Sequence, residues 1–263
     1  MKQLIFQVYL PIRGPSNLYD FCTDSVAKYC SKYGIDHVIL REPKLRINPD
    51  MSRTERNKIG LMKEAGYLPI FEKEWAFTYM DDYDQICVID ADIYVRESAP
   101  NIFDELDPNV AFAGVVEREM PIQEWYKKKI IGYSQMQYGH LHSNKSDFKP
   151  NRLGFEFYNM GLMLMNKSIM NYTKAKTARN FIERPEFKDF VDGKGAWKWS
   201  TDQTLLNYWL RKDGVPQQHL DWKWNALYTA VKDPTEANFV HFFLKDKLPN
   251  GGENIEQLME TVQ

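Results

Sequence analysis

The stretch Gln85-Ile86-Cys87-Val88-Ile89-Asp90-Ala91-Asp92 is an apolar run that ends in two carboxylates. Its β-branched residues predict a buried central strand over 85–89. Residues i and i+2 of an extended segment point the same way, so Asp90 and Asp92 can share one cation across the small Ala91. Open α/β sheets bind ligands beyond the carboxyl ends of their strands, which is where this pair falls. A turn in which an aspartate caps the strand end is the alternative interpretation.

Apolar patterning on both sides of this strand predicts an α/β fold. Further strands are expected at 3–9, 37–40, 110–116, 161–165 and 238–243, and helices at 18–33, 54–65, 71–80 and 202–211. The strand–helix–strand opening implies parallel pairing through a right-handed crossover. The segment 117–151 is mixed in composition and predicts a surface loop or a helical excursion. Because the chain has neither a repeat nor a low-complexity linker, we expect a single domain over 1–263.

Composition limits the classes of partner. The chain has 263 residues, 43% of them hydrophobic, and a formal net charge of −2. This composition supports a large core, and the small net charge gives the chain no overall electrostatic attraction to nucleic acid or to a membrane surface. The apolar start, 1–12, is too short to span a bilayer. The three cysteines, Cys22, Cys30 and Cys87, are an odd number without paired spacing, which predicts reduced thiols and a cytoplasmic chain.

Four segments, in order, resemble a known family. The stretch 83–95 resembles the Asp-x-Asp segment of GT-A fold glycosyltransferases, most closely the glycogenin-like family 8. Asn159-Met160-Gly161 is similar to that family's later Asn-x-Gly strand, and Asp202-Gln203 to its Asp-Gln segment at a helix start. His241, followed by Lys245 and Lys247, is similar to its metal-binding histidine and phosphate-binding lysine. The chain departs from the pattern after His241, where the family's glycine is missing, and at Thr204, where the family has a third acidic residue.

The resemblance implies a fold and a set of roles. It implies one GT-A domain, a Rossmann-like open mixed sheet with helices on both faces. Residues 1–116 would bind the nucleotide sugar and metal, and 117–263 would form the acceptor side. Asp90, Asp92 and His241 would hold Mn²⁺ or Mg²⁺. The donor-binding set would be Tyr9, Lys73, Asp90, Ala91, Asp92, Lys245 and Lys247, and the sugar and acceptor side would be lined by Asn159, Asp202 and Gln203.

Several of these residues also have plain structural interpretations. Tyr9 at a strand end suits the core as well as a nucleotide base. Asp202 or Thr201 can cap the helix that follows. Lys73, Lys245 and Lys247 can be solvated charges. An isolated histidine such as His241 often only fills space in the core or on the surface.

The expected activity is metal-dependent transfer of a hexose from a nucleotide-diphosphate sugar, with a UDP-sugar as the expected donor, to a hydroxyl of a carbohydrate acceptor. Family 8 resemblance implies retention of configuration, by same-face attack in which the leaving phosphate takes the acceptor proton. Two alternatives stay open. A phosphohydrolase of the haloacid-dehalogenase type also uses Asp-x-Asp after an apolar strand, although it normally has Thr or Val where this chain has Tyr94. A nucleotide-sugar-binding protein without turnover is the other.

Overall fold

A computed structural model describes residues 1–56, 64–142 and 148–262. Its main sheet has six strands in the order β2-β1-β3-β8-β5-β9. All pairings are parallel except those of β8, which runs antiparallel to both of its neighbours, β3 and β5. The strands are β1 Gln3–Val8, β2 Asp36–Leu40, β3 Gln85–Asp90, β5 Phe112–Val116, β8 Tyr158–Asn166 and β9 Gln217–His219. The mixed α/β fold expected from the sequence is therefore confirmed.

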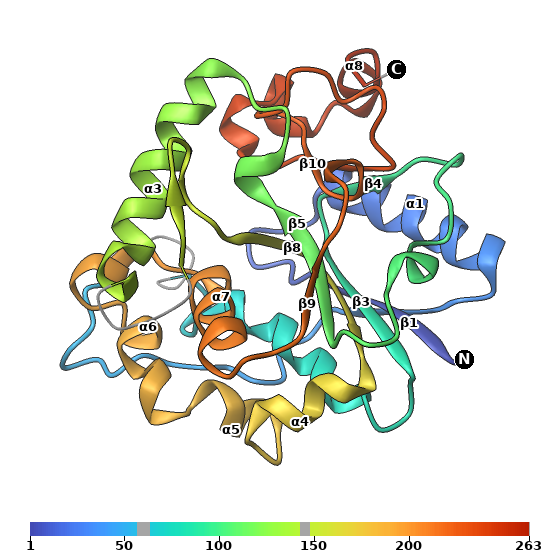
Figure 1. Cartoon of the computed structure of the whole chain (residues 1–263). Helices are drawn as coiled ribbons and strands as arrows, with labels where there is room; N and C mark the ends of the chain where they lie inside the picture. Colours follow the sequence, from blue (N-terminus) through green and yellow to red (C-terminus); the bar gives the residue numbers. More distant parts are fainter. Residues whose placement is uncertain (57–63, 143–147, 263) are drawn as a thin grey trace.

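The centre of the sheet is covered on both faces. Residues 85–89 of β3 and 158–165 of β8 are buried at every position, which requires packing on the two sides. In Figure 1, α1 (Asn17–Tyr33) lies to one side of the central strands and α7 (Asp202–Lys212) to the other. In the described part of the chain, further α-helices are α3 Glu124–His142, α4 Met170–Thr173, α5 Ala178–Ile182, α6 Lys188–Asp192 and α8 Ile255–Met259.

The opening β1-α1-β2 unit follows its sequence signals. Ser16 caps α1 by accepting the backbone N–H of Tyr19, and Gly34 ends it in the left-handed region at φ 67°. Strands β1 and β2 pair in parallel, as the crossover requires. The helix expected over 54–65 falls largely on residues outside the described part of the chain.

The helix expected over 71–80 is corrected to a 3₁₀ helix, Pro69–Tyr79. At three residues per turn, Phe71, Glu74 and Phe77 share one side, and Glu72 and Ala76 are buried on the others, so the segment is enclosed rather than amphipathic. Pro69 at its first position starts the segment. Glu72 then anchors it by accepting the backbone N–H groups of 44–46 at 2.6–2.9 Å.

A second, smaller sheet stands beside the carboxyl end of β3. It has the order β10-β11-β4, with strands β4 Ile93–Val95, β10 Ala226–Leu227 and β11 Phe239–His241. Strand β4 begins only three residues after β3 ends, so the Asp90-Ala91-Asp92 segment is the link between the two sheets. A two-stranded hairpin, β6 Pro150–Asn151 and β7 Gly154–Phe155, completes the strands.

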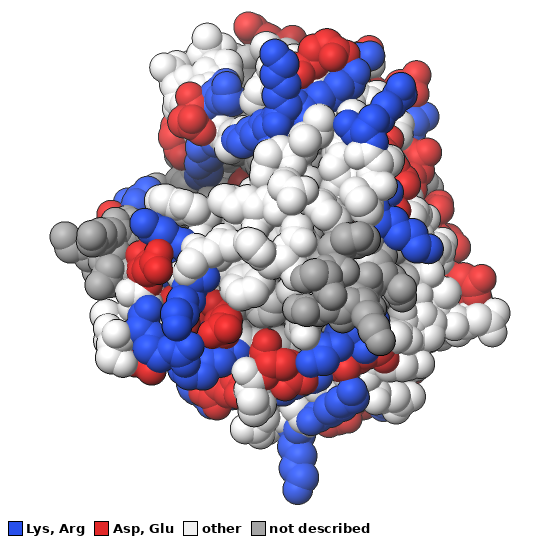
Figure 2. All heavy atoms as spheres, turned by 60° about the vertical axis from the view of Figure 1, so that its left-hand side comes forward, with Lys and Arg blue, Asp and Glu red and all other residues white. Residues whose placement is uncertain are grey.

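The segment 117–151 contains the long helix α3, so the helical alternative holds. One face of α3 is buried, including Tyr126, Ile130 and Tyr138, and it packs on β7 and α7. Figure 2 shows basic and acidic side chains mixed around the margin of one face, with a broad area of uncharged residues between them. Within the described residues, no helix combines the length and apolar character needed to cross a bilayer.

Candidate functional site

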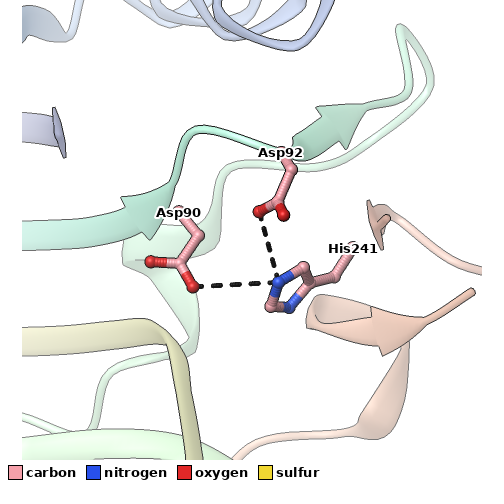
Figure 3. A group of neighbouring side chains, drawn as sticks. All are labelled: Asp90, Asp92 and His241. Atoms are coloured by element: carbon pink, nitrogen blue, oxygen red, sulfur yellow. Dashed lines mark ion pairs between the residues drawn. The ribbon is translucent and has the colours of Figure 1, made fainter. Parts of the chain in front are cut away.

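The link between the sheets presents two carboxylates to one cavity. Asp90 is the last residue of β3, Ala91 is buried beneath the turn, and Asp92 precedes β4. Both side chains point toward the ring of His241 (Figure 3). Their exposed fractions are 30% and 16%, so both carboxylates are reachable from the cavity yet partly desolvated.

Pairing of β11 with β4 brings His241 to this turn from 149 residues later in the chain. His241 lies opposite Ile93 in the antiparallel register, and the N–H of Phe242 donates to the carbonyl of Asp92 at 2.9 Å. The His241 Nε2 atom lies 3.3 Å from Asp92 Oδ1 and 3.7 Å from Asp90 Oδ2. One ligand atom from each of the three residues lies within 4.8 Å of the others.

The donor set fits a divalent cation. Burial alone would lower the pKa of His241, but Asp92 and Asp90 outweigh it and raise that pKa. Burial would raise the pKa of Asp92, and His241 and Lys245 together lower it. Two carboxylates and one imidazole suit Mn²⁺. A cation held by these three residues would keep further positions for a substrate's oxygen atoms.

Lys73 joins Asp90 to Asp202. Its amine lies 2.9 Å from Asp90 Oδ1, 2.8 Å from Asp202 Oδ2 and 2.9 Å from the carbonyl oxygen of Met160. Burial would lower the pKa of Lys73, but the two carboxylates raise it well above its usual value. Lys73 therefore holds a fixed positive charge between the end of β3 and the start of α7, and its side chain is only 12% exposed.

Thr201, rather than Asp202, caps α7. The Thr201 hydroxyl accepts the N–H of Gln203 at 3.3 Å, which leaves the Asp202 carboxylate to pair with Lys73. The Gln203 side-chain carbonyl accepts the N–H of Met160 at 3.1 Å. This bond ties the start of α7 to β8 beside the carboxylates.

Gly161 is required where β8 passes His241. A Cβ built there would lie 2.4 Å from Cε1 and 2.6 Å from Nδ1 of the His241 ring. Both contacts are far below van der Waals distance, so any side chain at this position would displace the ring. The Asn159-x-Gly161 pattern thus has a packing cause in this fold.

A cavity of about 560 Å³ contains these groups. Among the sequence-predicted residues it is lined by Lys73, Asp90, Ala91, Asp92, Asn159, Asp202, Gln203 and His241. The cavity is also lined by residues that no sequence motif marks: Glu117, Tyr126, Lys129, Tyr133 and Tyr19. Glu117 follows directly on β5, so the strand-end rule that selected Asp90 would also have found it.

Tyr9, Lys245 and Lys247 were expected to bind the donor, but they are not among the residues that line this cavity. Tyr9 is 3% exposed and does not line the cavity; its hydroxyl accepts the N–H of Ser16 at 3.0 Å. The Lys245 amine lies 3.6 Å from the Tyr19 ring centroid, close enough to Asp92 to help lower that carboxyl's pKa. The Lys247 amine instead lies 4.3 Å above the ring of Trp125, in a separate surface pocket.

Known structures share this fold. One is a glycosyltransferase involved in glycosylation of the major capsid of PBCV-1, with a TM-score of 0.54, 14% identity, and coverage of 98% of this chain and 100% of that one. A second is mouse xyloside xylosyltransferase 1, with a TM-score of 0.51, 13% identity, and coverage of 95% of this chain and 100% of that one. A third is the galactosyltransferase LgtC, in complex with donor and acceptor sugar analogues, with a TM-score of 0.50, 14% identity, and coverage of 98% of this chain and 95% of that one. No protein-family model matches the chain, and no curated protein matches it in sequence. The likeness shows a GT-A glycosyltransferase fold.

Proposed function

We propose that the chain is a metal-dependent glycosyltransferase that moves a hexose from a UDP-sugar to a hydroxyl of a carbohydrate acceptor. The observation that carries the proposal is the convergence of Asp90, Asp92 and His241 at the cavity. A nucleotide diphosphate brings its own oxygen atoms, which can complete the shell of a cation held by these three residues. When bound, the cation would stabilise the negative charge of the departing diphosphate as a Lewis acid.

The protein groups opposite the metal ligands suit the sugar. Lys73 offsets one of the two negative charges of Asp90 and Asp202, and the carboxylate of Asp202 can still accept hydrogen bonds from sugar hydroxyls. Gln203 and Asn159 line the same wall. We assign the donor phosphates to the side of Asp92 and Lys245, and the hexose to the side of Asp202 and Gln203.

We propose retention of configuration. The bond between the sugar's anomeric carbon and the diphosphate oxygen breaks, a bond to the acceptor hydroxyl oxygen forms on the same face, and the acceptor proton passes to the leaving phosphate. Asp202 is held by Lys73 in an ion pair, so we assign it to orientation of the hexose rather than to nucleophilic attack. Residues from both 1–116 and 117–263 line the cavity, and acceptor choice is assigned to the second part.

Release of UDP tests the activity. Purified protein with MnCl₂ and each of several UDP-hexoses should release UDP slowly even without acceptor, and EDTA should stop the release. Binding of a UDP-sugar with no release would favour the binding-protein alternative. Hydrolysis of p-nitrophenyl phosphate in place of UDP release would favour the phosphohydrolase, which the glycosyltransferase fold speaks against.

The cysteines bear on the compartment. Cys22, Cys30 and Cys87 are all buried, unpaired thiols. Free thiols of this kind persist in reducing compartments, so we propose that the chain works in the cytoplasm.

A further inference from the structure

A line of buried hydrogen bonds runs away from the metal-facing edge of His241. Its Nδ1 atom lies 3.0 Å from the side-chain oxygen of Asn225. The Asn225 amide nitrogen donates to the side-chain oxygen of Asn159 at 3.0 Å, and the Asn159 amide nitrogen donates to Glu117 at 2.9 Å. The hydroxyl of Tyr126 closes the line by donating to the other oxygen of Glu117.

Every member of this line is shielded from water. Asn225 is fully buried, and Glu117, Asn159 and His241 are 4%, 6% and 5% exposed. A buried amide that lost its partner would carry the full cost of desolvation, so each of these groups is held in one orientation. The line comes from four parts of the chain, and Asn225 itself lies just after the 3₁₀ helix Trp222–Trp224.

The orientation of each amide follows from one fixed donor. The backbone N–H of Gly161 donates to the side-chain oxygen of Asn159 at 3.0 Å, and a backbone N–H can only donate. The oxygen of Asn159 therefore faces Gly161 and Asn225, and Asn225 must turn its amide nitrogen toward it. The oxygen of Asn225 is then left to face His241, where only a protonated Nδ1 can meet it.

We propose that Asn225 is a positioning residue that fixes the tautomer of His241, so that the unprotonated Nε2 faces Asp90 and Asp92. The inference rests on the proposed metal site and extends it to a residue that touches neither metal nor substrate. Without Asn225, the proton of the neutral ring would move to Nε2, where Asp92 Oδ1 at 3.3 Å can accept it. A ring in that form cannot bind a cation until the proton leaves, and loss of such an orienting partner costs about tenfold to a hundredfold in metal affinity.

Two readouts test this assignment without any sugar donor. In the metal-free protein, ¹⁵N NMR of the histidine ring nitrogens, at a pH where the ring is neutral, should give His241 as the Nδ1–H form. In Asn225→Leu it should change to the Nε2–H form. The dissociation constant of Mn²⁺, from the EPR signal of the free ion, should rise at least about tenfold. His241→Gln identifies the resonance among the chain's five histidines.

Two further variants separate positioning from general loss of packing. Asn225→Asp keeps an acceptor opposite Nδ1 and should retain the Nδ1–H form, while its second oxygen faces the oxygen of Asn159 and should lower the stability of the fold. Asn207→Leu removes another fully buried asparagine, one that bonds to the backbone of Tyr158 and not to His241, and should change neither readout.

The outcomes are distinct. A folded Asn225→Leu protein that keeps the Nδ1–H form and native Mn²⁺ affinity overturns the positioning role. Should Asn225→Leu fail to fold, loss of the Nδ1–H form in Asn225→Asp would overturn it instead. Failure of the wild-type protein to bind Mn²⁺ would count against the proposed function, and the tautomer measurement would still decide the role of Asn225.

Discussion

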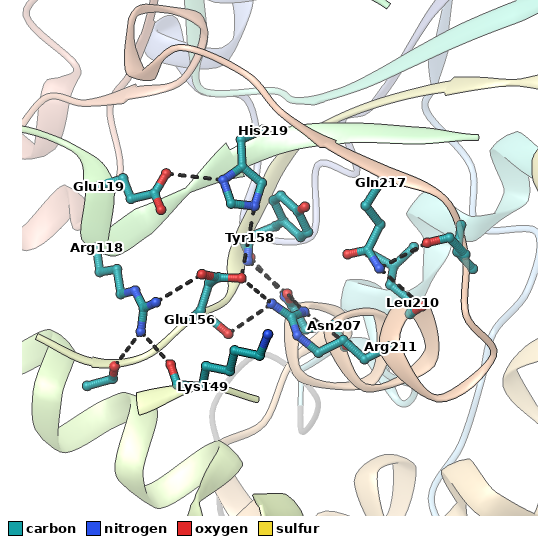
Figure 4. A network of polar contacts seen from close by, with 12 residues as sticks. Arg118, Glu119, Lys149, Glu156, Tyr158, Asn207, Leu210, Arg211, Gln217 and His219 are labelled. Carbon is teal, nitrogen blue, oxygen red and sulfur yellow. Dashed lines mark hydrogen bonds and ion pairs between the residues drawn. The ribbon is translucent and has the colours of Figure 1, made fainter. Parts of the chain in front are cut away.

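Two polar clusters lie at the same edge of the main sheet, and they are built on opposite principles. The open cluster is Asp90, Asp92 and His241 at the end of β3. The closed cluster surrounds Glu156, beyond the ends of β5 and β9 (Figure 4). Glu156 meets Arg118 at 2.9 Å and Arg211 at 3.4 Å, and His219 lies between it and Glu119. The open cluster has no guanidinium, and Lys73 takes only one carboxylate oxygen of Asp90.

The difference shows that carboxylates at strand ends do not by themselves mark a metal site. In the closed cluster, Arg118 and Arg211 pair with Glu156 and also donate to backbone carbonyls, so the cluster ties several segments together, although Arg118 Nε has no hydrogen-bond partner among the described residues. In the open cluster, Asp92 pairs with His241, whose pKa the carboxylates raise, and Lys245 adds a more distant positive charge. Carboxylates whose negative charge is not fully compensated, and which line a cavity, indicate a binding site, whereas a cluster of fully paired charges has a structural role.

The largest effect is expected at Lys73, the lysine that pairs with Asp90 of the open cluster and with Asp202. Lys73→Met leaves the buried Asp202 without its partner, and should lower the free energy of unfolding by about 3 kcal/mol. Urea denaturation of the metal-free protein measures it. Lys174→Met removes a lysine that is 62% exposed, from an aspartate that keeps Arg184, and should cost less than about 0.5 kcal/mol. Equal losses in the two variants would contradict the role given to Lys73.

The closed cluster should respond in stability alone. Glu156→Gln removes the charge that Arg118 and Arg211 share, and these arginine side chains are only 8% and 5% exposed. We expect a loss of about 2 kcal/mol in urea denaturation. The affinity for Mn²⁺ should stay at the wild-type value. A fall in Mn²⁺ affinity would mean that the two clusters are coupled and the comparison is wrong.

Gly161→Ala should damage the open cluster through packing. The added methyl meets the His241 ring at 2.4 Å, so the ring must leave its position between the carboxylates. Mn²⁺ affinity, measured by EPR, should fall about tenfold. Gly132→Ala is the matched control, since nothing lies within 4 Å of a Cβ at that position in α3. An unchanged affinity in Gly161→Ala would show that His241 is not held by this contact.

Mn²⁺ binding should weaken as the pH falls. Asp92 and Asp90 raise the pKa of His241 against the opposing effect of burial, and only the neutral ring can bind a cation. Below that pKa, each pH unit should therefore cost about a factor of ten in affinity. Titrations with Mn²⁺ at a series of pH values measure the slope. His241→Gln should bind more weakly with a flatter profile, and an equally steep profile would assign the proton to another group.

The smallest effect is expected at the tail lysines, and it distinguishes them. Lys245→Ala should weaken UDP binding in the presence of Mn²⁺ about threefold, because Lys245 lies beside Tyr19 and Asp92. Lys247→Ala should leave it unchanged, since Lys247 packs over Trp125 in another pocket. Calorimetry at low salt resolves the difference, and a larger effect of Lys247→Ala would reverse the assignment.

The sequence predicts the site unevenly, for physical reasons. Asp90 and Asp92 follow from an apolar strand and the rule that strand ends bind ligands. His241 follows only from family resemblance, because its place depends on the β11–β4 pairing across 149 residues. Asn225 carries no sequence signal, since it lies in irregular structure and its role comes from the amides around it. The 3₁₀ form of Pro69–Tyr79 does not follow from the sequence, because its buried positions lie on several sides and give no period that separates 3.0 from 3.6 residues per turn.

The central claim is that Asp92 helps to hold the cation that binds the donor's diphosphate. Thermal denaturation with UDP tests it, because a ligand of the folded state raises the melting temperature. UDP should raise the melting temperature of the wild-type protein only when Mn²⁺ is present, and the rise should vanish in Asp92→Asn. A rise without Mn²⁺, or an undiminished rise in Asp92→Asn, would contradict the account.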